Sequence, residues 1–246
     1  MMEMLAATVA LGVGALIGAS GIGGVLLVSF LTVSGMLGIH EAAATSLFSF
    51  VFTGLMGTWL FQRKGSIEWR LALPVCAGAA VASLVGTTVA ATLDAATLSI
   101  VVGATIAAAG LNVLMPRRAA AAVGRPAPTG NLPMLAVGAA SGFGSGLSGA
   151  GGPVFSVPIM LALRHSALVA VGVGQVLQVV AAVAGTTSNL GRGLVDWRLA
   201  FLLAGFQLIG VAVGVRLAHA VNERWIKALA GGLCLLAGGL LALQAA

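Results

Sequence analysis

The sequence predicts an all-α polytopic membrane protein made of two inverted-topology repeats, each a glycine-broken helical hairpin plus three transmembrane helices. The first observation is composition: of 246 residues, 59% are hydrophobic and only 7% are charged, whereas about a quarter of the residues of a soluble domain are charged. The second is length, because apolar stretches of about 20 residues, enough to cross a bilayer core as a helix, recur along the chain. The third is that the pattern of the first half returns in the second.

The second half repeats the first at an offset of 128 positions without a gap. The stretch GASGIGGVLLVSF, which starts at Gly18, returns as GLSGAGGPVFSV from Gly146, and the tetrapeptide WRLA occurs at Trp69 and again at Trp197. Apolar helices share Ala and Leu by chance, but matched glycine clusters together with a matched Trp-Arg pair indicate an internal duplication. Internal repeats of this kind are the usual construction of secondary transporters.

Each half begins with a long apolar stretch that a glycine cluster interrupts, and three uninterrupted spans follow it. The interrupted stretches are Met4–Leu37 and Asn131–Leu163, and the plain spans are Glu41–Gln62, Trp69–Thr92, Ala95–Met115, Ser166–Leu190, Trp197–Ala220 and Glu223–Leu243. We therefore divide the chain into a first transmembrane repeat (residues 1–115), a cytoplasmic linker rich in Pro and Arg (116–130) and a second transmembrane repeat (131–246).

The distribution of basic residues favours a hairpin over a single kinked span for each interrupted stretch. As one helix, Met4–Leu37 would be about 50 Å long, too long for one crossing without extreme tilt. As a hairpin it leaves only Arg192 and Arg198 outside, in keeping with the positive-inside rule. The basic residues then on the cytoplasmic side are Arg63, Lys64, Arg70, Arg117, Arg118, Arg125, Arg164, Arg216, Arg224 and Lys227. The second half consequently enters the membrane from the opposite side, and both chain ends lie outside. Whether the hairpins cross fully or re-enter stays open.

The two glycine clusters are the predicted substrate site. A helix broken inside the membrane is tolerated only where its backbone is buried in protein or lines a polar cavity. The helix that restarts after each break points its N–H groups and positive dipole end inward, which suits an anion. The predicted binding residues at the breaks are Ser20, Gly21, Gly23, Gly24, Ser148, Gly149, Gly151 and Gly152. The Gly14/Gly18 and Gly142/Gly146 pairs are instead typical of close helix packing.

Polar residues on the span after each break extend this predicted site. They are Thr45, Ser46 and Ser49 in the first half and Gln175 and Gln178 in the second. Buried polar side chains in a membrane are costly and often functional. The alternative for the hydroxyls is a bond to their own helix, and for the glutamines a bond between helices. The sequence predicts no catalytic residue, metal site, cofactor or nucleic-acid partner, and the net charge of +6 reflects loops at the cytoplasmic face.

With its paired glycine-rich hairpins in GASGIGGVLLVSF and GLSGAGGPVFSVP, the whole chain resembles the sulfite exporter TauE/SafE family. The resemblance implies a multi-pass transporter of the bacterial plasma (inner) membrane that exports sulfite, sulfoacetate or related organosulfonates. It implies a small anionic substrate and the lipid bilayer as partners, and a homodimer is one oligomeric state left open. Val25 stands where the second copy has Pro153, which predicts that the two breaks bind unequally.

Two other functions remain open at this point. The GLSG motif around Ser148 has the form found around the nucleophile of rhomboid intramembrane proteases, with His165 and His219 as the available bases. The duplicate motif at Ser20 speaks against a single nucleophile. A passive anion channel could use the same fold, and coupling by voltage, protons or exchange is not fixed by the sequence.

Overall fold

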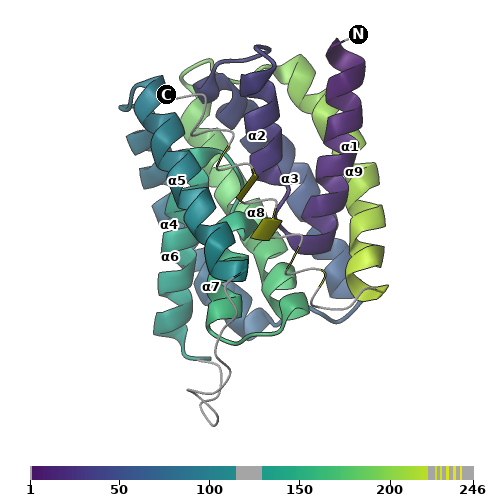
Figure 1. Cartoon of the computed structure of the whole chain (residues 1–246). Coiled ribbons are helices and arrows are strands. Elements are labelled where there is room, and N and C mark those ends of the chain that lie inside the picture. Colours follow the sequence, from purple (N-terminus) through teal and green to yellow (C-terminus); the bar gives the residue numbers. More distant parts are fainter. Residues whose placement is uncertain are drawn as a thin grey trace.

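The computed structural model describes residues 2–114 and 129–220, with isolated positions at 225, 228, 231–232, 235–236 and 239, and the regular secondary structure of this part of the chain is all helical (Figure 1). Its nine helices within 2–220 are α1 (Met2–Ser20), α2 (Gly24–Val33), α3 (Ile39–Arg63), α4 (Trp69–Ala90), α5 (Ala95–Leu114), α6 (Asn131–Ser148), α7 (Pro153–Ala162), α8 (Ala167–Leu190) and α9 (Trp197–Ala220). Most of the predicted linker 116–130 and of the predicted span Glu223–Leu243 lies outside the described residues. The all-helical prediction is confirmed.

Five of the helices are long and apolar enough to cross a membrane. They are α1, α3, α4, α8 and α9, each of 19 to 25 residues. The predicted interruptions are confirmed as well, because α1 ends at Ser20 before α2 begins at Gly24, and α6 ends at Ser148 before α7 begins at Pro153. The second arm of each hairpin has only 10 residues, which makes it about 15 Å long, half of a bilayer core.

The chain reverses at each break through glycines in the left-handed region. Gly21 has φ 75° and its counterpart Gly149 has φ 64°, values that a residue without Cβ adopts at little cost. The breaks then differ, since Gly151 has φ 89° whereas Gly23 has φ −115°. The Pro153 that begins α7 has no counterpart in α2, which begins at Gly24.

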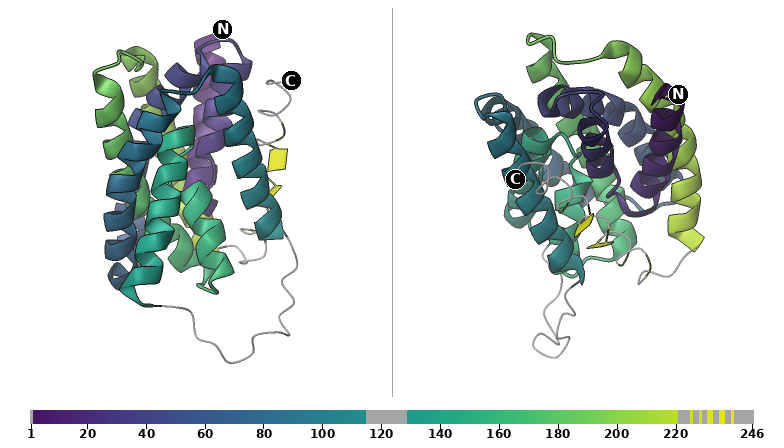
Figure 2. Two further views of the ribbon diagram at one scale, coloured as in Figure 1. Left: turned by 90° about the vertical axis from the view of Figure 1, so that its left-hand side faces the viewer. Right: turned by 45° about the horizontal axis from the view of Figure 1, so that its top comes forward.

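The largest helix interfaces join one half of the chain to the other. The most extensive interfaces are α4 with α6 and α1 with α9 (Figure 2). Helices α3 and α8 contact each other, and α8 also contacts α4 while α3 also contacts α9. A Cβ on Gly18 would lie 2.5 Å from the carbonyl oxygen of Val211, and one on Gly142 would lie 2.6 Å from Cα of Ala79. Side chains there would force the helices apart, so the packing interpretation of these glycines is confirmed.

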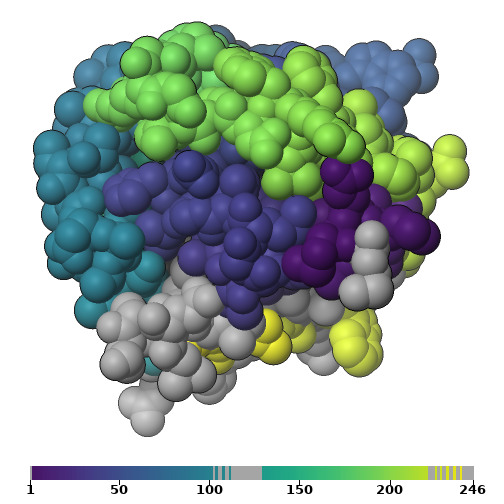
Figure 3. All heavy atoms as spheres, turned by 90° about the horizontal axis from the view of Figure 1, so that it is seen from above, coloured from purple at the N-terminus to yellow at the C-terminus, as the bar shows by residue number. Residues whose placement is uncertain are grey.

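The upper end of the molecule carries a polar cluster around the start of α9. Seen from above, the turn between α2 and α3 lies between α5 on one side and the beginning of α1 on the other (Figure 3).

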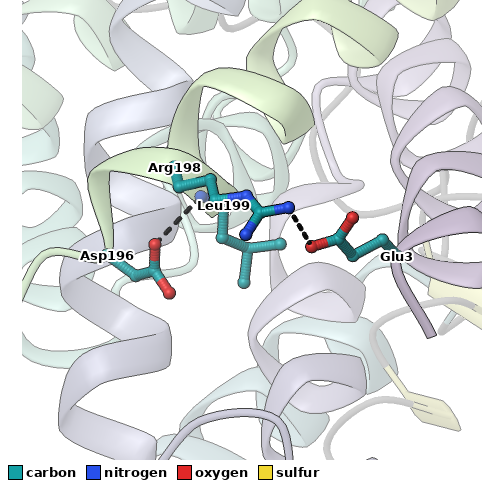
Figure 4. Close-up of polar contacts among 4 residues, drawn as sticks. All are labelled: Glu3, Asp196, Arg198 and Leu199. Carbon is teal, nitrogen blue, oxygen red and sulfur yellow. Dashed lines mark hydrogen bonds and ion pairs between the residues drawn. The ribbon is translucent and has the colours of Figure 1, made fainter.

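Arg198 forms an ion pair with Glu3 at 3.0 Å, and the Asp196 carboxylate accepts the Leu199 N–H at 2.9 Å (Figure 4). Side chains of Glu3, Asp196 and Arg198 border a pocket of about 170 Å³. Because Glu3 and Arg198 are largely exposed, this pair contributes about 1 kcal/mol or less.

Candidate functional site at the two helix breaks

The two breaks meet in the buried centre of the molecule. Gly24 lies directly against the carbonyl oxygen of Ala150, so the start of α2 touches the turn before α7. The two breaks are also in contact through Gly21, since a Cβ on this glycine would lie 2.9 Å from Cβ of Pro153. Ser20, Ala150 and Pro153 are all buried. The two glycine clusters, 128 positions apart in sequence, therefore form one structural site.

The short helices α2 and α7 begin in this site without side-chain caps. Neither Gly23 before α2 nor Gly152 before α7 provides a capping side chain. Helices α4 and α6 also begin without a side-chain cap, whereas the Ser166 hydroxyl caps α8 by accepting the Val169 N–H. The first N–H groups of a helix have no partner within it and carry the positive end of the helix dipole. Two such ends converge on one buried region, and this is the arrangement that favours an anion.

Ser20 and Ser148 shape the turns in the same way. The Ser20 hydroxyl donates to the Leu16 carbonyl at 2.9 Å and accepts the Ile22 N–H at 3.2 Å. Ser148 does likewise, with bonds of 2.7 Å to the Gly144 carbonyl and 3.2 Å from the Ala150 N–H. Each hydroxyl has one proton to donate. In this conformation each hydroxyl donates its proton to a carbonyl of the preceding helix, so neither serine has a proton left to donate to an anion.

The two glutamines of α8 join three helices around the breaks. The Gln175 amide donates to the Ile17 carbonyl at 2.9 Å, one turn before Gly21. The Gln178 amide donates to Thr53 Oγ1 at 2.7 Å and, more weakly, to the Phe50 carbonyl at 3.4 Å. Both glutamine side chains are buried. Gln178 also reaches the second break, since a Cβ on Gly151 would lie 3.8 Å from Gln178 Oε1.

The predicted α3 residues do not all face the breaks. The Thr45 hydroxyl accepts the Asp196 N–H at 3.1 Å, which places it beside the loop before α9. The Ser49 hydroxyl donates to the Ser46 carbonyl at 2.8 Å. Ser46 Oγ is buried and has no hydrogen-bond partner among the described residues. The structure therefore brings together the breaks and Gln178, whereas Thr45 lies toward the upper end.

One residue at the centre was missed by sequence reasoning. A Cβ on Gly24 would lie 2.8 Å from Cζ of Phe50, and one on Gly151 would lie 3.5 Å from Cδ2 of the same ring. Phe50 is fully buried and lies between the two breaks. The signal was present in the repeat, because Phe50 occupies the position that corresponds to Gln178 at the offset of 128.

Within the described residues, no group of three His, Cys, Asp or Glu side chains could hold a metal ion. His219 instead joins α9 to the loop after α3: its Nδ1 lies 2.8 Å from the Val215 carbonyl of its own helix, and its Nε2 lies 2.9 Å from the Ser66 hydroxyl. Because a carbonyl only accepts, Nδ1 carries the proton and Nε2 accepts the Ser66 O–H in the neutral ring. The Phe61 ring is packed against this imidazole at a centroid distance of 5.0 Å.

Comparison with known proteins identifies the family to which the chain belongs. The family described as "Sulfite exporter TauE/SafE" matches residues 6–241. Over 215 residues, which are 86% of this chain and 87% of the relative, the chain is 26% identical to a protein of Bacillus subtilis (strain 168) described as "Probable membrane transporter protein YdhB". No solved structure matches significantly. Since the family match covers most of the chain and includes both glycine breaks, the chain belongs to the sulfite exporter TauE/SafE family and is a multi-pass membrane transporter, not an enzyme.

Proposed function

We propose that this transporter exports sulfite, sulfoacetate or a related organosulfonate, and that backbone N–H groups at the two breaks hold the anion. One observation carries the proposal: two helix N-termini without side-chain caps, Gly24 of α2 and Pro153 of α7, meet in the buried centre. The anion is thus bound by partial charges and not by a buried Lys or Arg. Membership of a sulfite exporter family supports the substrate class.

The two halves are inverted repeats in this proposal. At the offset of 128, helices α1 to α4 and α6 to α9 begin at corresponding positions to within one residue. In Figure 1 α1 begins at the upper end of the molecule and α6 at the lower end, which supports entry of the two halves from opposite sides. With the basic loops in the cytoplasm of a bacterium, the upper end faces away from the cytoplasm across the inner membrane.

Voltage drives export in this proposal. Every described Asp, Glu, Lys and Arg lies in a loop or within about a turn and a half of a helix end, so no such group is placed to relay a proton at mid-helix. An inside-negative potential favours anion exit by about 2.3 kcal/mol per charge for each 100 mV. The Phe50 side chain fills the space between the breaks, and this favours a carrier that changes conformation over a permanently open channel.

The test uses purified full-length protein in liposomes with a potassium diffusion potential and equal pH on both sides. We expect sulfite flux to follow the sign of the voltage. Flux that ignores voltage and appears only with a pH gradient contradicts the voltage proposal. Absence of both flux and calorimetric binding for sulfite, sulfoacetate and simple alkanesulfonates contradicts the substrate class.

A matched pair of variants tests the breaks. Gly151→Ala places a methyl group between Phe50 and Gln178, whereas Gly35→Ala adds one where no atom lies within 4 Å. Both glycines have positive φ, 89° and 69°, so both variants lose roughly 1–2 kcal/mol of stability through backbone strain. We expect only Gly151→Ala to weaken sulfite binding, by at least about tenfold, or about 1.4 kcal/mol. Equal binding in the two variants contradicts a site at the second break.

A further inference from the structure

The space between the two breaks is filled by an aromatic side chain. The Phe50 ring touches the first break at Gly24 and the second at Gly151, with distances of 2.8 and 3.5 Å to the Cβ positions of those residues. Gly24 also lies against the Ala150 carbonyl oxygen. An anion with three oxygen atoms cannot reach the N–H groups of both breaks while these contacts persist. The described conformation is therefore closed to substrate at its centre.

The two halves contribute different chemistry to this position. Phe50 of α3 and Gln178 of α8 are counterparts at the offset of 128, and the Gln178 amide donates to the Phe50 carbonyl and to Thr53. Gln178 is thus held in place by α3 through two hydrogen bonds. The Phe50 ring is held by packing alone, since a hydrocarbon ring has no hydrogen-bonding group. Of the two counterparts, the ring is the one that can leave its position without breaking a hydrogen bond of its own side chain.

We infer that Phe50 determines which anions the transporter admits: its ring closes the space between the breaks and must move aside when substrate binds. This inference rests on the proposed function, because it takes the breaks as the site. The ring sets an upper limit on the substituent that an organosulfonate can carry. Once displaced, its edge, the positive side of the aromatic quadrupole, is a favourable neighbour for an anion.

The experiment compares two deletions of the same side chain from the same helix. Phe50 and Phe61 are both fully buried in α3, but Phe61 is packed against His219 and not against the breaks. Phe50→Ala and Phe61→Ala therefore remove equal volumes from the core. Flux of sulfite and of the bulkier benzenesulfonate is measured in liposomes for both variants and the unaltered protein.

We expect Phe50→Ala to raise the ratio of benzenesulfonate to sulfite flux at least tenfold, and Phe61→Ala to leave that ratio unchanged. An equal ratio in both variants overturns the inference. If Phe50→Ala does not fold, as judged by gel filtration in detergent, Phe50→Leu replaces it, with an increase of at least threefold expected and an unchanged ratio again decisive against the inference.

Iodide flux separates this inference from the proposed function. If the unaltered protein carries neither sulfite nor any organosulfonate, the proposed substrate class fails. The role of Phe50 is then decided by iodide alone: faster iodide flux in Phe50→Ala than in both Phe61→Ala and the unaltered protein supports a ring that closes the centre, and equal flux overturns it.

Discussion

Individual glycines of this chain meet two distinct physical demands, and the structure separates them. Gly193 needs only backbone freedom, because its φ is 65° and no atom lies within 4 Å of its Cβ position. Gly18 needs only space, since it lies within a regular helix against the backbone of α9. Gly149 needs both, with φ 64° and the backbone of Ala43 against its Cβ position.

The first prediction compares Gly149→Ala with Gly193→Ala. Both variants place an alanine at positive φ, at a cost of roughly 1–2 kcal/mol. Only Gly149→Ala also drives a methyl group into Ala43, whose carbonyl oxygen would lie 2.8 Å away. We expect the melting temperature in detergent to fall clearly further for Gly149→Ala. Equal melting temperatures would mean that the second break relaxes away from α3 at no cost.

The second prediction concerns Gln175, in which only one of the two polar atoms of the side chain has a hydrogen-bond partner. Its amide N–H donates to the Ile17 carbonyl, but its Oε1 is buried against Gly57 without a partner among the described residues. The counterpart, Leu47, is packed on Gly185 in the same manner. Gln175→Leu removes this unpaired oxygen, and the Ile17 carbonyl that loses the amide still accepts the Gly21 N–H at 2.9 Å, so neither group is left buried without a partner. The free energy of unfolding of Gln175→Leu should therefore lie within about 1 kcal/mol of that of the unaltered protein.

Binding measurements on the same variant decide the role of Gln175. We expect sulfite affinity to fall in Gln175→Leu, because the amide no longer fixes the last turn of α1 before the first break. Unchanged affinity at unchanged stability would assign Gln175 to packing and remove it from the site.

At the scale of helices, the glycine faces of α1 and α6 determine how closely their partners approach. Gly14 and Gly18 face α9, and Gly142 and Gly146 face α4. Such close approach maximises dispersion contacts between helices where lipid provides no hydrophobic driving force. Each glycine face meets glycines of its partner helix, Gly210 and Gly214 on α9 and Gly78 and Gly86 on α4.

The third prediction tests this face with a matched control on the same helix. A Cβ on Gly18 would lie 2.5 Å from the Val211 carbonyl oxygen, whereas one on Gly12 would meet no atom within 4 Å. Gly18→Leu should abolish recovery of monodisperse protein in detergent, and Gly12→Leu should leave it unchanged. Comparable yields for the two variants would contradict the assignment of Gly18 to helix packing.

Helix positions could be predicted from the sequence because the repeat and the apolar lengths constrain them independently. The predicted starts at Trp69, Ala95, Asn131 and Trp197 coincide with those of α4, α5, α6 and α9. The site was only partly predictable. Glycine clusters and buried glutamines are visible in the sequence, but Phe50 reads as an ordinary apolar residue of a membrane span. Its position between the two breaks depends on how α3 packs against helices of the second half, and the sequence around Phe50 does not encode that packing.

At the scale of the whole molecule, the basic residues predict the orientation in the membrane. Lys64 and Arg192 occupy corresponding positions of the two halves, in the turn that follows α3 and the turn that follows α8. If the halves are inverted, these two turns lie on opposite sides of the membrane. The fourth prediction is that in intact cells an impermeant maleimide labels Arg192→Cys but not Lys64→Cys.

The labelling uses a background in which Cys76 and Cys234 are replaced by alanine, and permeabilised cells serve as the control for reactivity. Labelling of both cysteines from outside would contradict the inverted arrangement. Labelling of Lys64→Cys alone would agree with the inverted arrangement but would show that the protein has the opposite orientation in the membrane.

The pairing of α1 with α9 has a consequence for how the protein is made. When α1 leaves the ribosome, the helix that covers its glycine face begins at Trp197, almost the whole described chain later. At about 5–20 residues per second, roughly 10–40 s of translation separate the two. During that interval Gly14 and Gly18 face lipid or the insertion machinery, and the first break has no partner from the second half. A nascent chain stalled before α9 should therefore be a preferred target for membrane-protein quality control, and pulse-chase degradation of truncations ending before and after α9 would show the difference.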